Sequence, residues 1–249
     1  MPNRMGTSEE GKEDCQFAKN DAPPFLSGPK AYLYGKEALA LARDALRASQ
    51  ETGVSVIYTP QLTDLRLIAE NVHGLYLCAQ HMDPIAPGKG QGSILAEALK
   101  DAGADCAMLN HAERPMTLNA LVRSVERARE VGLLSVVCAD SCKEAAMLAM
   151  LAPDILVVEP TELIGTGVTS DEALVRASTE AVKAVNPEIQ VLQGAGISSP
   201  DDVYRTIFAG ADATGSSSAI CKAEQPGKML KDMLLACRQA YEDRMAKRG

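Results

Sequence analysis

The stretch "DILVVEPTELIGTG" (Asp154–Gly167) joins a short apolar run to a carboxylate, a proline and two closely spaced glycines. A near-continuous apolar run of this length is typical of a parallel strand that is covered on both faces. Glu159 follows the run directly, and the ring of Pro160 then restricts the backbone. The stretch therefore predicts a buried strand that delivers a carboxylate to a glycine-containing loop.

Short apolar runs of the same kind recur along the chain and alternate with longer segments of helical period. The helical segments include 37–50, 117–132 and 173–186, where apolar residues are spaced three and four positions apart. Repeated strand–helix units predict parallel strands joined by right-handed crossovers. Six runs are clear, and two weaker candidates at 23–30 and 211–220 bring the number to eight. The clear runs are Val54–Pro60, Gly74–Gln80, Asp105–His111, Leu133–Ala139, Asp154–Pro160 and Ile189–Gly196.

Eight strand–helix units predict an α/β protein with a single (β/α)8 barrel. A length of 249 residues fits one such barrel. An open, doubly wound parallel sheet is the alternative, although no G-x-G-x-x-G motif follows the first strand. Residues 1–24 are polar and end in two adjacent prolines, so we expect a disordered N-terminal tail, with the barrel spanning 25–249.

The overall composition argues against several classes of partner. A net charge of −8 and a pI near 5.0 disfavour a surface that binds nucleic acid or an anionic membrane. The sequence has no apolar run of 18 residues and no signal peptide, so we expect a cytoplasmic protein without a membrane span. The seven cysteines are scattered and odd in number, which predicts neither a disulfide framework nor a metal site.

Chemically active side chains follow three of the predicted strands. In a (β/α)8 barrel, residues just past the carboxyl ends of the strands converge on one face, where active sites form. Lys30, His111 and Glu159 follow the first, fourth and sixth strands. An ammonium, an imidazole and a carboxylate suit proton transfer beside an anion. Three loops rich in glycine or serine offer backbone N–H groups to a phosphate.

Several motifs resemble the triosephosphate isomerase family. "VEPTELIGTG" resembles the sixth strand and mobile loop of that family, and "LNHAER" resembles its fourth-strand histidine motif. "AQHMDPIAPGKGQGSILAEALKDAGA" and "GAGISSPDDV" resemble the shorter archaeal-type branch. The resemblance extends from Phe25 to the C-terminal helix. It implies a TIM barrel that needs no cofactor or metal and assembles into a homodimer or homotetramer.

The resemblance also implies an activity and a role for each site residue. The activity is interconversion of glyceraldehyde 3-phosphate and dihydroxyacetone phosphate through an enediol(ate), a step of glycolysis and gluconeogenesis. Glu159 is then the general base, and His111 polarises the substrate carbonyl. Lys30 stabilises the enediolate charge, and Glu113 pairs with Lys30. The residues expected to bind the small phosphorylated sugar are Gly28, Ile164, Gly165, Gly196, Ser217 and Ser218.

The sequence departs from the family at the end of the first strand. The family motif there is Asn-x-Lys, whereas this chain has Gly28-Pro29-Lys30. The loop Gly215–Ala219, "GSSSA", also replaces a more apolar strand ending. A glycine at position 28 is expected to remove a substrate contact and to make room. Two alternatives therefore stay open, an isomerase of a tetrose phosphate or larger sugar phosphate and a non-catalytic phosphosugar-binding barrel.

Overall fold

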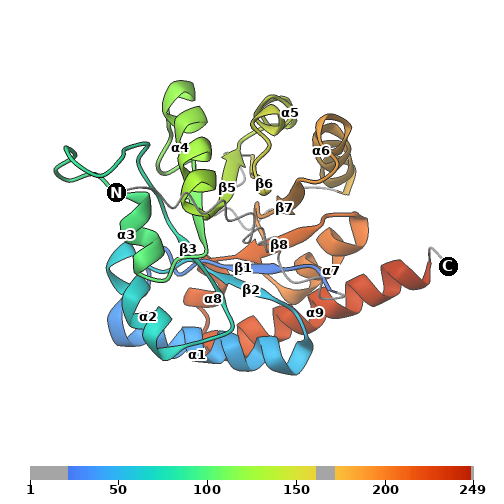
Figure 1. The fold of residues 1–249 in the computed structure, drawn as a ribbon. Helices are drawn as coiled ribbons and strands as arrows, with labels where there is room; N and C mark the ends of the chain where they lie inside the picture. The colour runs from blue at the N-terminus through green and yellow to red at the C-terminus, as the bar shows by residue number, and fades with distance from the viewer. Residues whose placement is uncertain (1–21, 161–171, 248–249) are drawn as a thin grey trace, which may run out of the picture.

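The computed structural model describes residues 22–160 and 172–247, and its centre is a closed barrel of eight parallel strands in sequence order (Figure 1). This confirms the predicted (β/α)8 barrel, and the alternative of an open sheet is wrong. Residues 1–21 of the expected tail and the segment 161–171 lie outside the described residues. The strands are β1 (Phe25–Ser27), β2 (Val56–Tyr58), β3 (Tyr76–Ala79), β4 (Cys106–Leu109), β5 (Leu134–Ala139), β6 (Ile155–Val158), β7 (Gln190–Gln193) and β8 (Ala213–Ser216).

Helices surround the barrel, and the longest, α9, lies against both α1 and α7 (Figure 1). None of the described helices is long and apolar enough to cross a membrane. The α-helices are α1 (Gly35–Thr52), α2 (Leu65–Asn71), α3 (Ala96–Asp101), α4 (Leu118–Val131), α5 (Cys142–Leu148), α6 (Glu172–Val185), α7 (Pro200–Ala209), α8 (Ser218–Cys221) and α9 (Pro226–Ala246), and short 3-10 turns are η1 (Leu62–Asp64) and η2 (Ala149–Leu151).

Local sequence signals account for the helix ends. Ser199 caps α7 and forms a reciprocal capping box with Asp202, and Pro200 occupies the first helical turn. Thr117 caps α4 by accepting a hydrogen bond from the Ala120 N–H. The helix ends at Gly132, whose φ of 74° lies in the left-handed region that glycine adopts without a steric penalty.

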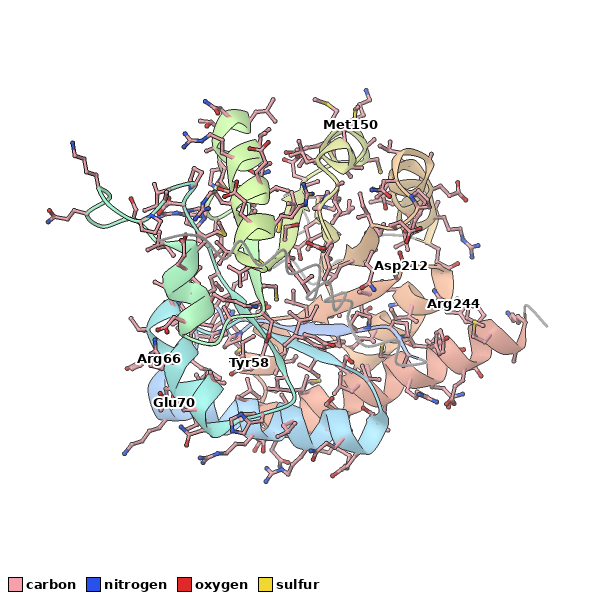
Figure 2. The ribbon with its side chains drawn as sticks, in the orientation of Figure 1. Tyr58, Arg66, Glu70, Met150, Asp212 and Arg244 are labelled. Atoms are coloured by element: carbon pink, nitrogen blue, oxygen red, sulfur yellow. The ribbon has the colours of Figure 1, made fainter. Side chains whose placement is uncertain are left out.

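The strands separate two apolar layers because successive side chains point to opposite faces. One layer fills the barrel interior, and the larger one packs between the strands and the helices. Leu26 and Ile57 point inward, whereas Tyr58 points outward and donates its hydroxyl to the Ala38 carbonyl of α1 at 2.8 Å. In Figure 2, Tyr58 lies in the interior of the fold, whereas Met150, with 79% of its area exposed, lies at the outer surface.

The described chain begins just before β1. Ala22 to Pro24, which belong to the expected tail, are buried against the barrel. The carbonyl of Pro23 accepts a hydrogen bond from the Cys237 thiol of α9 at 3.6 Å. The contact between α9 and the chain entering β1 therefore joins the two ends of the barrel sequence.

Candidate active site

Glu159 lies at the carboxyl end of β6 and points into the mouth of the barrel. Its backbone N–H donates to the Ala139 carbonyl of β5 at 2.9 Å, which extends the sheet by one residue. Val157 faces the barrel interior, so the alternation along the strand turns Glu159 inward as well. Gly194, one residue past the neighbouring strand β7, has no side chain, and the Glu159 carboxylate occupies the space where a Cβ at that position would lie. A glycine after β7 is therefore what admits the carboxylate.

A left-handed residue turns the chain after β4 so that His111 faces the same mouth. Asn110 has a φ of 59°, a conformation that asparagine tolerates better than most residues. Its side-chain amide donates to the Cys138 carbonyl at 3.0 Å, and its side-chain oxygen accepts the Met116 N–H at 3.0 Å. The Glu113 N–H then donates to Nδ1 of His111 at 3.1 Å. In the neutral ring this bond places the proton on Nε2.

Lys30 adopts a strained backbone conformation that two amide side chains support. Its φ is 46°, which is unfavourable for a residue with a long side chain. Its carbonyl accepts hydrogen bonds from Nε2 of Gln61 at 2.7 Å and Nε2 of Gln80 at 3.0 Å. Because the two glutamines come from the ends of β2 and β3, neighbouring strands hold the turn that presents the ammonium group.

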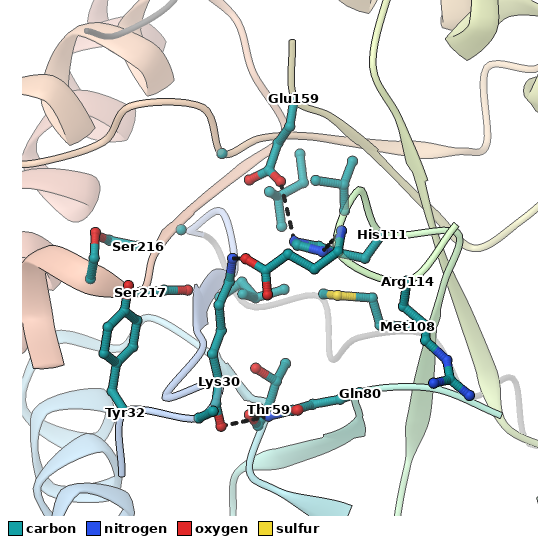
Figure 3. Close-up of a pocket in the computed structure, with 18 of the residues that line it drawn as sticks. Lys30, Tyr32, Thr59, Gln80, Met108, His111, Arg114, Glu159, Ser216 and Ser217 are labelled. Atoms are coloured by element: carbon teal, nitrogen blue, oxygen red, sulfur yellow. Dashed lines mark hydrogen bonds and ion pairs between the residues drawn. The ribbon is translucent and has the colours of Figure 1, made fainter. Parts of the chain in front are cut away.

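The side chains of Lys30, His111, Glu113 and Glu159 line the mouth of the barrel, although they come from three different strand ends. Figure 3 shows Lys30, His111 and Glu159 around this space. Nζ of Lys30 lies 2.7 Å from Oε1 of Glu113. Nε2 of His111 lies 3.8 Å from Oε2 of Glu159. These groups line a cavity of about 560 Å³, in which an acid, a base and a cation face the same space.

The surroundings shift the proton affinities of the two central groups in opposite directions. Burial raises the pKa of the Glu159 carboxyl, which the Lys30 ammonium partly offsets. Burial lowers the pKa of His111, and the Lys30 ammonium lowers it further. The hydrogen bond from Lys30 lowers the pKa of Glu113. Glu159 thus becomes a stronger base than an exposed carboxylate, and the imidazole is held neutral.

Of the residues expected to bind phosphate, those that the structure describes lie around the same cavity. Gly196 follows β7 with a φ of 70°, and Ser217 and Ser218 begin α8. Asp202 anchors the loop after Gly196 by accepting hydrogen bonds from the backbone and hydroxyl groups of Ser198 and Ser199. Burial raises the pKa of Asp202, but these bonds outweigh it and lower the value to about 2. Ile164 and Gly165 lie outside the described residues.

Gly28 does not leave the empty space that the sequence suggested. A Cβ placed on this residue would lie 2.8 Å from Oγ of Ser217 and 2.9 Å from Oγ1 of Thr59. Neither distance is compatible with an ordinary van der Waals contact. The expectation that the glycine makes room is therefore wrong, because hydroxyls from β8 and β2 approach the position from both sides.

Sequence reasoning did not assign roles to Gly194, Gln61, Gln80 or Thr59. Gly194 admits the Glu159 carboxylate, and the two glutamines hold the Lys30 carbonyl. Thr59 directly follows β2 and lines the cavity. The signal that could have found these residues is their shared position, one or more residues past a strand and on its inward face.

A (β/α)8 barrel with a neutral imidazole, a carboxylate and an ammonium group at its mouth defines the class of proton-transferring isomerases. The family model "Triosephosphate isomerase" matches residues 29–233. The triosephosphate isomerase of Methanothermus fervidus is 39% identical over 219 residues, which cover 86% of this chain and 98% of the relative. That of Sulfolobus acidocaldarius is 37% identical over 226 residues, with 89% and 98% covered.

Comparison with solved structures shows the same barrel fold. The crystal structure of triosephosphate isomerase from Bartonella henselae superposes with a TM-score of 0.68, covering 89% of this chain and 99% of that one. The sequence identity of 18% makes this a likeness of fold alone. The chain belongs to the triosephosphate isomerase family, in its archaeal-type branch. The enzymes that carry this name are aldose–ketose isomerases.

Proposed function

We propose that this protein interconverts glyceraldehyde 3-phosphate and dihydroxyacetone phosphate through an enediol(ate). The observation that carries the proposal is the approach of Nε2 of His111 to within 3.8 Å of the Glu159 carboxylate, at a mouth that also holds the Lys30 ammonium. Family membership supports a triose phosphate over a longer sugar phosphate and over a barrel without turnover.

Glu159 is the general base of the proposed reaction. Its carboxylate removes a proton from the carbon next to the substrate carbonyl and returns it to the neighbouring carbon. Burial raises the pKa of this carboxyl, so the carboxylate binds the proton more strongly than an exposed glutamate does. Its raised pKa also brings the proton affinity closer to that of the weakly acidic substrate carbon.

His111 and Lys30 stabilise the charge that develops on the substrate oxygens. The Nε2–H of a neutral His111 donates to the carbonyl oxygen and exchanges protons between the two enediolate oxygens. Triosephosphate isomerase is itself the standard example of a neutral histidine in this role. The bond from the Glu113 N–H to Nδ1 supports the required tautomer here. Lys30, held by Glu113, places a positive charge beside the same oxygens.

Backbone N–H groups hold the phosphate in the proposed complex. Gly196, Ser217 and Ser218 line the described part of the cavity, where peptide N–H groups can bind an anion. Ile164 and Gly165 complete the proposed binding set from the loop after β6.

The direct test is an isomerisation assay on purified protein with triose, tetrose and pentose phosphates. We expect rapid conversion of glyceraldehyde 3-phosphate to dihydroxyacetone phosphate and much lower kcat/KM for the longer sugars. Conversion of a tetrose phosphate with higher kcat/KM than the triose would overturn the assignment of substrate. Binding of all the sugars without conversion of any would instead indicate the non-catalytic barrel.

We further propose that the protein is cytoplasmic and that it forms a homodimer or homotetramer. The proposal of an assembly is based on the loop between β3 and α3. Hydrogen bonds between Asp83 and Ile94 close the base of this loop, and residues 86–93 are exposed. The loop projects from the barrel near α3 and α4 (Figure 1). In the family the corresponding loop enters the neighbouring subunit. Light scattering on the full chain tests this, and a monomer at micromolar concentration would contradict it.

A further inference from the structure

Gly28, Thr59 and Ser217 occupy one level of the barrel mouth on three adjacent strands. Ser27 of β1 is in register with Tyr58 of β2 and with Ser216 of β8. The Thr59 N–H donates to the Ser27 carbonyl at 3.1 Å, and the Gly28 N–H donates to the Ser216 carbonyl at 3.3 Å. These bonds carry the register one residue beyond the strands.

All three positions also face inward. Two residues earlier, Leu26 and Ile57 belong to the interior layer, and Gly215 packs against Leu26. Alternation along each strand then directs residues 28, 59 and 217 toward the mouth. A side chain at position 28 would therefore begin between the hydroxyls of Ser217 and Thr59.

The two hydroxyls are available to a ligand. Thr59 and Ser217 both line the cavity together with Lys30. Among residues 22–160 and 172–247, neither hydroxyl has a hydrogen-bonding partner in the protein. In Figure 3, Ser217 and Thr59 lie on the same side of the mouth as the Lys30 side chain, and Glu159 and His111 lie across the space from them.

We propose that Oγ1 of Thr59 and Oγ of Ser217 bind the substrate oxygen beside Lys30 and together replace the amide of the family's asparagine. A hydroxyl can both donate and accept, so the pair can bind a carbonyl oxygen or an enediol hydroxyl. The hydroxyls also fill the space that the glycine would otherwise leave. They therefore preserve selection of a triose phosphate over a longer sugar, and this inference rests on the proposed function.

The first test removes the hydroxyls while keeping the shape of the site as far as possible. Thr59→Val and Ser217→Ala are each expected to lower kcat/KM for glyceraldehyde 3-phosphate about threefold to tenfold, the range for one lost hydrogen bond. The control is Thr179→Val on α6, which removes a hydroxyl bonded only within its helix. An unchanged kcat/KM in the double variant Thr59→Val/Ser217→Ala would overturn the proposal.

The second test asks whether position 28 and the hydroxyls are coupled. Gly28→Asn should impair the wild-type chain, because the new Cβ would meet both hydroxyls. The same change in a Thr59→Ala/Ser217→Ala background should raise kcat/KM above that of its parent and restore the preference for the triose over a tetrose phosphate. Equal effects in the two backgrounds would show that the positions act independently and would contradict the proposal.

A binding measurement separates failure of this inference from failure of the proposed function. Calorimetry with phosphoglycolate, a two-carbon phosphorylated carboxylate, reports on the site without turnover. The dissociation constant should rise in the variants Thr59→Val and Ser217→Ala and stay unchanged in Thr179→Val. A wild type that binds this probe but isomerises no triose refutes the proposed function alone. Unchanged binding in both hydroxyl variants refutes the present inference.

Discussion

The two sides of the barrel mouth each contain a glycine one residue past a strand, but the two glycines accommodate different groups. On the side of β6 and β7, Gly194 admits the carboxylate of Glu159. On the side of β8, β1 and β2, Gly28 is flanked by the hydroxyls of Ser217 and Thr59. The first side keeps the motifs of the family, whereas the second departs from them. The same residue type thus serves proton transfer on one side and substrate contact on the other.

This difference follows from how tightly each side is constrained. A general base and an electrophile must lie within reach of one substrate and of each other, and small displacements reduce the rate strongly. More than one set of side chains can bind an uncharged substrate oxygen, because an amide and a pair of hydroxyls can both supply the hydrogen bonds. Substitution is therefore easier on the side of β8, β1 and β2.

The change with the largest expected effect is Glu159→Gln. It keeps the shape of the side chain and removes the base, so kcat should fall about 10²–10⁴-fold while phosphoglycolate still binds. Initial rates with glyceraldehyde 3-phosphate measure this. The matched control is Glu70→Gln on the exposed face of α2, which should leave the rate unchanged. Near-normal turnover of Glu159→Gln would mean that the base is elsewhere.

His111→Ala tests the second reacting group on the side of the mouth that holds Glu159. Loss of a group that stabilises charge in the transition state typically lowers kcat about 10²–10³-fold. We expect kcat to fall much more than substrate affinity, and His73→Ala, at an exposed position, to behave as wild type. A rise in KM alone would show that His111 only binds the substrate.

Gln80→Met tests whether the hydrogen bond from Gln80 holds the backbone of Lys30 in place. Lys30 lies between the two sides of the mouth. The variant removes an amide that donates to the carbonyls of Lys30 and Thr59, each at 3.0 Å. Two lost hydrogen bonds predict a decrease in kcat/KM of about 5-fold to 100-fold. Gln239→Met, on the surface of α9, is the control. Equal kinetics for the two variants would show that Lys30 keeps its position without Gln80.

Glu113→Gln should have the smallest effect on rate and a distinctive effect on pH dependence. The negative charge of Glu113 raises the pKa of Glu159, and the charge of Lys30 lowers it. Replacing Glu113 by glutamine removes the charge that raises the pKa of Glu159 and leaves the charge of Lys30 in place, so the pKa of Glu159 should fall. Because Glu159 acts as the unprotonated base, the acidic limb of the kcat/KM profile should shift to lower pH. A shift to higher pH would contradict this electrostatic arrangement.

The sequence was sufficient for the barrel because its signals are local and repeated. The predicted strands include all eight observed ones. The reacting side chains could also be predicted to converge, since each follows a strand. The approach of Ser217 and Thr59 to Gly28 could not be predicted, because it depends on the register between β8, β1 and β2. A missing side chain indicates a free volume only when its neighbours across the sheet are known.

The central claim is that Glu159 transfers a proton between adjacent carbons of the substrate. The most direct test converts dihydroxyacetone phosphate to product in D₂O and follows the carbon-bound hydrogens of the product by NMR. A carboxyl that holds the proton can exchange it with solvent, so we predict deuterium at C2 of glyceraldehyde 3-phosphate, formed by the wild type and lost with Glu159→Gln. Deuterium that enters C2 at the same rate with Glu159→Gln as with the wild type would show that another group moves the proton and would contradict the account.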